Sequence, residues 1–161
     1  MPLSYKKMKN KFLFYSVLCL VISTVACSKE TVESEPQIKI PFSGKYTWSF
    51  SIPLMGTQKS THVFYADSVF YKMEGQVYNT SYMQLLHSYD TSQHKLISIG
   101  RGGSIPKNGV YFVMFFKDIT DTSVSIYKHE CSNGESEALN FQRPADNATA
   151  DYGWNVYYKE D

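Results

Sequence analysis

Short runs in which apolar and polar residues alternate dominate the chain after residue 41. In residues 45–53, KYTWSFSIP, the apolar Tyr46, Trp48 and Phe50 occupy every second position. A period of two places these side chains on one face of an extended chain, which is typical of a half-buried β-strand. The same reasoning predicts eight further strands, at residues 61–66, 68–73, 78–89, 95–99, 110–119, 123–129, 138–142 and 154–159.

Turn-forming residues separate most of these runs, and no long stretch has helical spacing. The run at residues 110–116, VYFVMFF, is apolar at every position and indicates a central strand covered on both faces. Residues 42–161 are therefore predicted to form one all-β domain, an antiparallel barrel of eight or nine strands, with a β-sandwich as the alternative. Residues that tolerate a positive φ angle mark the short loops at Ala66-Asp67, Glu74-Gly75, Asn108-Gly109 and Asn133-Gly134.

Residues 1–26 have the organisation of an export signal. Four lysines precede an apolar stretch at residues 12–26, and the small Ala26 stands directly before Cys27. This segment resembles the signal peptide of bacterial lipoproteins, with Thr24 at the position that usually holds Leu, as in the relaxed signals of Bacteroidetes. The resemblance implies cleavage after Ala26 and acylation of Cys27, which metabolic labelling with palmitate would detect. An uncleaved anchor, which needs about 20 apolar residues, and plain secretion are the alternatives.

The residues that follow Cys27 bear on location. Ser28 is not the aspartate that marks inner-membrane retention, so the resemblance implies an outer-membrane lipoprotein anchored through its lipid. The acidic residues Glu30, Glu33 and Glu35 resemble the export signal of surface-exposed Bacteroidetes lipoproteins. Residues 27–41 lack aromatic residues and hydrophobic periodicity, and they are predicted to form a flexible tether.

Charge and cysteine content exclude some partners and cross-links. Removing residues 1–26 with their four lysines leaves 12 basic and 15 acidic residues, a net charge of −3. A nucleic-acid partner is therefore not expected, because phosphate binding needs a basic face. With Cys19 in the signal and Cys27 acylated, Cys131 has no disulfide partner in the chain, and we expect a buried, inert thiol.

Residues 44–48, Gly-Lys-Tyr-Thr-Trp, resemble the Gly-x-Trp motif on the first strand of lipocalin-like (calycin) domains. Here Tyr46 stands in the place of the Trp, and Trp48 is displaced by two residues along the same face. In that family the Trp packs across the barrel floor with an Arg from the last strand, a role for which Arg143 is the candidate. The resemblance implies a small apolar or amphipathic ligand, with Tyr46, Trp48 and Arg143 as candidate binding residues. Alternatively, Trp48 is simply a core aromatic residue and Arg143 a solvated one.

Tyrosine is unusually frequent, with 13 in the chain, and its apolar ring and hydroxyl suit partly wet cavities. Aromatic residues also favour strands, so this composition does not choose between a ligand-binding barrel and a structural or protein-interaction lipoprotein with a filled barrel. The interior decides: a cavity of about 300 Å³ or more favours a ligand.

Metal and catalytic chemistry have weaker support. Residues 110–118 and 154–157 resemble zinc-binding calycins, but His62, His87, His94 and His129 show no paired ligand spacing. The one local cluster is His129 and Cys131, which could share a face, with Glu130 between them. We expect no metal site and no cofactor. The chain has no nucleophile elbow, phosphate-binding loop or HExxH motif, so we expect no enzymatic activity.

Overall fold

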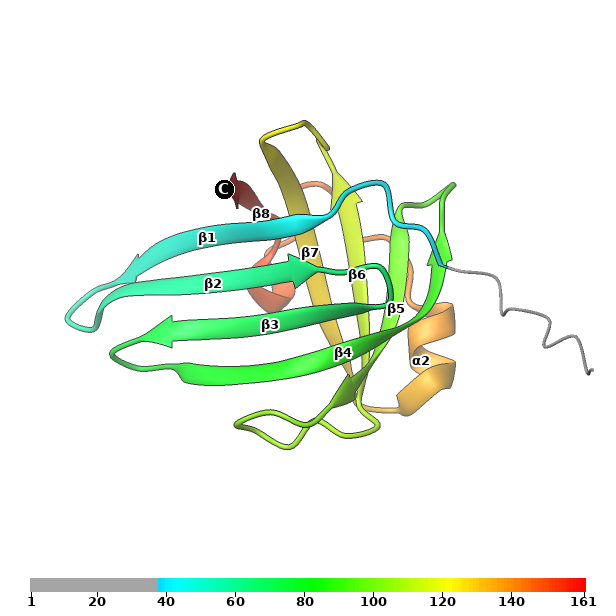
Figure 1. Ribbon diagram of the computed structural model, residues 1–161, viewed down its shortest axis with the longest axis horizontal. Helices are drawn as coiled ribbons and strands as arrows, with labels where there is room; N and C mark the ends of the chain where they lie inside the picture. The colour runs from blue at the N-terminus through cyan, green and yellow to red at the C-terminus, as the bar shows by residue number, and fades with distance from the viewer. Residues whose placement is uncertain (1–37) are drawn as a thin grey trace, which may run out of the picture. The chain divides into compact units, whose positions relative to one another are not determined.

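A computed structural model of the chain describes residues 38–161 (Figure 1). These residues belong to one compact unit, Pro36–Asp161. The predicted signal peptide at residues 1–26, the lipid attachment at Cys27 and all but the last four residues of the predicted tether lie outside the described residues. Within residues 38–161, no helix is both long and apolar enough to cross a lipid bilayer.

Eight antiparallel strands form a closed barrel in which each strand pairs with its neighbours along the chain. Strand β1 pairs with β2 over its whole length, and residues 45–47 pair with β8, which closes the barrel. The all-β prediction is confirmed, and the barrel rather than the sandwich forms. The strands are β1 (Gly44–Ile52), β2 (Gly56–Phe64), β3 (Ser68–Gly75), β4 (Asn79–Asp90), β5 (Lys95–Arg101), β6 (Tyr111–Lys117), β7 (Ser123–Cys131) and β8 (Asn155–Glu160).

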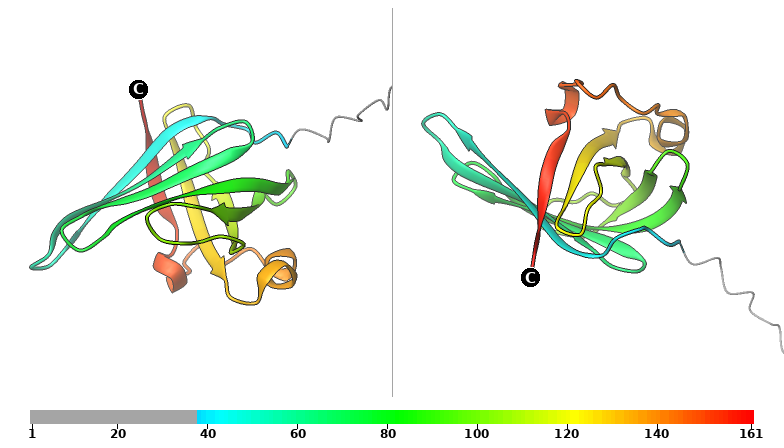
Figure 2. Two further views of the ribbon diagram at one scale, coloured as in Figure 1. Left: turned by 60° about the horizontal axis from the view of Figure 1, so that its bottom comes forward. Right: turned by 90° about the horizontal axis from the view of Figure 1, so that it is seen from above.

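Two short helical segments accompany the strands. Helix α2 (Gly134–Asn140) follows β7, and the 3₁₀ turn η1 (Ala150–Tyr152) precedes β8. Helix α2 lies on the outside of the barrel, whereas the hairpins β1–β2 and β3–β4 project together to one side of it (Figures 1 and 2).

The alternation that predicted β1 also decides which side chains fill the barrel. Tyr46 is 2% exposed, and its ring packs edge-on against Phe42 and Phe64. Around it, the start of β1 and the end of β2 enclose a core made of the protein's own side chains. This buried cluster consists of Tyr46, Phe64, Val69, Leu96, Met114, Phe116, Val124, Ile126 and Tyr157.

The outer face of β6 is also covered, as its continuous apolar run predicts. Lys95 of β5 donates from Nζ to the carbonyl oxygens of Leu139 and Phe141, at 2.8 and 2.9 Å. Because a helix leaves its last carbonyl groups without internal partners, these bonds fix the end of α2 against the barrel. The cluster beneath the helix consists of Ile97, Val113, Phe115, Tyr127, Cys131 and Ala138.

Two predicted elements differ from the structure. The eighth of the nine predicted strands, residues 138–142, is instead the end of α2 and the residues after it, because Ala138 and Phe141 reach the barrel from one side of a helical turn. Strand β2 begins at Gly56 rather than residue 61. Its first inward-facing residues, Gln58 and Ser60, are polar although they are buried, so the hydrophobic pattern gave no sign of them.

Candidate functional site

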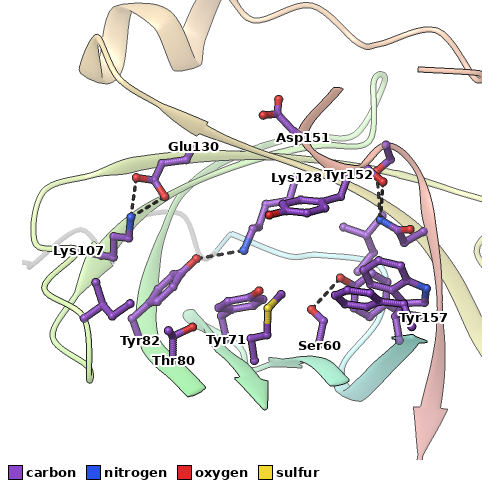
Figure 3. Close-up of a pocket in the computed structure, with 17 residues that line it drawn as sticks. Ser60, Tyr71, Thr80, Tyr82, Lys107, Lys128, Glu130, Asp151, Tyr152 and Tyr157 are labelled. Atoms are coloured by element: carbon purple, nitrogen blue, oxygen red, sulfur yellow. Dashed lines mark hydrogen bonds and ion pairs between the residues drawn. The ribbon is translucent and has the colours of Figure 1, made fainter. Parts of the chain in front are cut away.

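A pocket of about 290 Å³ lies inside the barrel, between β1–β4 on one side and β7, β8 and the η1 turn on the other (Figure 3). This volume lies just below the range of about 300–1,000 Å³ typical of small-molecule sites. The pocket therefore suits only a small molecule, held beside the filled core. The aromatic residues that line it are Trp48, Phe50, Tyr71, Tyr82, Tyr152 and Tyr157.

Lys128 of β7 places a cation among these rings. Its Nζ donates to the Tyr82 hydroxyl at 3.0 Å and lies 3.4 Å from the centroid of the Tyr71 ring. Figure 3 marks the bond from Lys128 to Tyr82. Glu130 lines the same pocket, but Lys107 binds it, with Nζ 2.7 Å from each carboxylate oxygen. Within residues 38–161, Lys128 therefore has aromatic and hydroxyl partners but no carboxylate in an ion pair.

Burial sets the protonation of these groups. It lowers the pKa of Lys128 to about 7, with the charge of Glu130 opposing this change and that of Lys107 adding to it. Burial also raises the pKa of Tyr71 to about 12, and that of Tyr82 still further. The tyrosine hydroxyls stay protonated and can donate hydrogen bonds, while an anion near Lys128 would favour its charged form.

His62 adds polar atoms beside the pocket. It is fully buried, with its ring centroid 4.9 Å from that of Tyr71 and 5.0 Å from that of Tyr157. Burial, and then the charge of Lys128, holds the pKa of His62 well below its usual range, so the ring is neutral. Neither ring nitrogen of His62, nor Nε2 of Gln84, has a hydrogen-bond partner among the described residues. Buried polar atoms normally have such a partner, so this part of the barrel suits water or a polar ligand group.

The structure separates the two aromatic candidates of β1. Trp48 is partly buried and lines the pocket, where its ring stacks on Phe50 with the centroids 4.3 Å apart. Tyr46 belongs to the packed core and is not among the residues that line the pocket. Tyr46, which stands in the place of the Trp of the Gly-x-Trp motif, thus packs in the core, and the displaced Trp48 forms part of the pocket wall.

Arg143 lies outside the barrel. Its guanidinium is 4.8 Å from the ring centroid of Trp154, and Nη1 donates to the carbonyl oxygen of Phe116 at 3.3 Å. The packing of Arg143 with Trp48 that the lipocalin resemblance implies does not form. The reason is that Arg143 precedes the last strand, in a connection whose Phe141 and Trp154 pack on the outer face of the barrel.

No histidine of residues 38–161 lines the pocket. His87 pairs with Glu135 at 3.0 Å, and His94 is 3.0 Å from the Tyr89 hydroxyl. The described histidines therefore do not assemble the open-end zinc site that the calycin resemblance implies. The cluster of His129, Glu130 and Cys131 is also divided, because Glu130 faces the pocket while the other two residues face outward. Cys131 is free and 4% exposed, and burial raises its pKa to about 11.

Sequence reasoning missed Lys128, although a signal for it exists. Val124 and Ile126 alternate with Ser125 and Tyr127, so the same period of two places Lys128 on the inward face of the strand. A lysine at an inward position of a small barrel is unusual enough to mark a site. Tyr71 and Tyr82 could be placed inside in the same way, but not beside Lys128.

Comparisons with protein-family models, curated proteins and solved structures find no significant match. The fold itself defines the class: a closed, eight-stranded antiparallel barrel with a pocket in its interior, an architecture consistent with a lipocalin-like barrel.

Proposed function

We propose that the protein is a lipid-anchored envelope lipoprotein whose lipocalin-like barrel binds a small amphipathic anion. One observation carries the binding proposal: Lys128 points into an aromatic pocket and has no carboxylate partner within residues 38–161. Charges buried in proteins are normally paired, because desolvation of an unpaired charge is costly. A carboxylate, phosphate or sulfonate group of a ligand would supply the missing partner.

The rest of the pocket suits an apolar ligand body. Trp48 and Phe50 form a stacked wall, and Tyr157 packs beside Trp48 with the ring centroids 6.1 Å apart. The Tyr157 hydroxyl is already engaged with the Ser60 hydroxyl at 3.0 Å, so this wall offers mainly ring surface. A small aromatic acid or a medium-chain fatty acid combines such a body with one negative group.

The anchoring part of the proposal rests on the sequence of residues 1–35. The lipoprotein-like signal ending at Ala26 supports acylation of Cys27, and Ser28 supports sorting to the outer membrane. Several acyl chains hold a protein stably on a membrane, since each buried methylene group contributes about 0.8 kcal/mol. The barrel would then bind its ligand next to the outer membrane, on either its periplasmic or its surface side.

A matched pair of fluorescent probes tests the binding proposal. 8-Anilinonaphthalene-1-sulfonate carries one sulfonate, and N-phenyl-1-naphthylamine has the same rings without it. We expect both to bind the wild-type protein. Lys128→Met should weaken binding of the sulfonate about tenfold or more, because a hydrogen bond to a charged group contributes about 1.5–3 kcal/mol. Binding of the uncharged probe should change less than about twofold.

Lys159→Met is the control, because Lys159 is an exposed lysine of β8 that does not line the pocket. It should leave the affinity for both probes unchanged. Equal affinity of wild type and Lys128→Met for the sulfonate would refute the role of Lys128. If neither probe nor decanoate binds the wild type, the alternative gains support: an interaction lipoprotein whose barrel is filled by its own core.

A further inference from the structure

The outer face of β7 carries a second group of polar side chains, which shares only Asp151 with the lining of the pocket. His129 lies there with its ring stacked on Phe141, the centroids 4.1 Å apart. Its Nδ1 is 2.7 Å from Oδ2 of Asp151, and its Nε2 is 2.8 Å from Oε1 of Glu137. A single imidazole thus joins β7 to α2 on one side and to the η1 turn on the other.

Cys131 completes this group. It follows His129 by two positions on the same strand, so both side chains point to the same face. One ligand atom from each of His129, Cys131 and Glu137 can be chosen so that all three lie within 4.8 Å of one another. The thiol is free, and all three side chains are largely sheltered: Cys131 is 4% exposed, and the side chains of His129 and Glu137 are 17% and 21% exposed.

We propose that His129, Cys131 and Glu137 bind a transition-metal ion of the Zn²⁺ type on the outside of the barrel. Nitrogen, sulfur and carboxylate oxygen together form a donor set that suits Zn²⁺, whereas Mg²⁺ and Ca²⁺ prefer oxygen alone. Three protein ligands leave a fourth position of the tetrahedron for water. A bound metal deprotonates a coordinating thiol outright, so Cys131 releases its proton to solvent on binding, and Nε2 of His129 releases the proton that it shares with Glu137.

The geometry needs only a small adjustment. Bonds of about 2.0–2.3 Å place neighbouring ligand atoms of a tetrahedral zinc site about 3.3–3.7 Å apart. Nε2 of His129 and Oε1 of Glu137 are 2.8 Å apart, so they must separate by about 0.5 Å for the metal to take the place of the proton between them. No two of the three ligand atoms are farther apart than 4.8 Å, so Cys131 Sγ needs to move by about 1 Å at most, which a χ1 adjustment at the end of β7 can provide.

Asp151 fits the role of a positioning residue. In metal sites, the ring nitrogen that does not bind the metal usually donates to a carboxylate, which fixes the tautomer and the ring orientation. Asp151 offers this carboxylate to Nδ1, and the Tyr127 hydroxyl donates to the same Oδ2 at 3.1 Å. The free nitrogen of His129 is then Nε2, which is the one that faces Glu137.

Metal binding can be measured on the protein purified from its membrane in mild detergent and stripped of metal with a chelator. We expect one Zn²⁺ per chain in a competition titration against a chromophoric chelator. Cys131→Ser and Glu137→Gln should each weaken Zn²⁺ binding at least about 100-fold, and Asp151→Asn about 10- to 100-fold, as for other residues that orient a metal ligand. Glu135→Gln is the matched control on α2, since Glu135 pairs with His87 instead, and its affinity should stay within twofold of the wild type.

Co²⁺ gives a readout that does not depend on a variant folding. Bound to the wild type, it should show a thiolate-to-metal charge-transfer band and the intense visible bands of tetrahedral Co²⁺. Cys131→Ser leaves the N-terminal cysteines as they are in the wild type, so loss of the band in this variant assigns it to Cys131. Absence of the band in the wild type, or equal Zn²⁺ affinity of the wild type and Cys131→Ser, would overturn the proposal.

Discussion

Replacing Tyr46 and Trp48 by alanine, one at a time, tests which aromatic residue of β1 belongs to the core. The two side chains lie on the same face of the strand, two positions apart. Tyr46 is 2% exposed and contacts the rings of Phe42 and Phe64 within the packed cluster. Trp48 is partly exposed on the wall of the pocket.

The expected loss in the free energy of unfolding depends on the space that each replacement leaves behind. Tyr46→Ala leaves a cavity enclosed by the core, and replacing a buried aromatic residue by alanine typically costs about 3–5 kcal/mol. The space left by Trp48→Ala joins the pocket and fills with solvent, so the cost is mainly partial burial and the stacking on Phe50. Stacking of this kind contributes about 0.5–1.5 kcal/mol, and we expect a total of about 1–3 kcal/mol.

Urea unfolding of the protein shortened to residues 36–161 measures both costs. For an m-value of about 1–3 kcal/mol per molar urea, a difference of about 2 kcal/mol separates the two midpoints by roughly 1 M. Tyr158→Ala is the control, because Tyr158 is 64% exposed and should change the stability by less than about 0.5 kcal/mol. Trp48→Ala should also weaken probe binding, whereas Tyr46→Ala should not. If Trp48→Ala costs as much as Tyr46→Ala, the assignment of Trp48 to an open pocket wall is wrong.

Two further predictions concern the lipid anchor and the seam of the barrel, where β1 pairs with β8. Cys27→Ser should leave an unprocessed precursor without palmitate label; normal processing of the wild type in globomycin, with no label incorporated, would exclude lipidation. At the seam, hydrogen bonds from Lys45 and Lys59 lower the pKa of Glu160 to about 2, so its stabilising effect should be complete above about pH 4.5 and lost as the pH falls toward 2. Because these ion pairs are partly exposed, Glu160→Gln should lower the free energy of unfolding by only about 0.5–1 kcal/mol at pH 7. Thermal unfolding should show that the stability difference between wild type and variant disappears at acidic pH. A difference that stays constant from pH 7 to pH 2 would contradict this interpretation.

The sequence of residues 42–161 was sufficient to predict most of the strands and the barrel class. Side chains alternate along a strand with a fixed period of two, so Tyr46, Trp48 and Phe50 had to share a face. The same rule predicted that His129 and Cys131 could lie together, as they do on the outer face of β7. The apolar run in β6 correctly indicated cover on both faces, because a strand with one wet face would carry polar residues at every second position.

Contacts between distant parts of the chain decided where helix α2 lies and which residues surround Lys128. Helix α2 is held by Lys95, about 45 positions away along the chain, and local propensity in so short a segment could not reveal that. Likewise, alternation could place Lys128 inside the barrel, but only the closed sheet brings it onto Tyr71 and Tyr82 of β3 and β4. The physical reason is that periodicity records which side of an element is buried, whereas a site depends on which elements the closed barrel brings face to face.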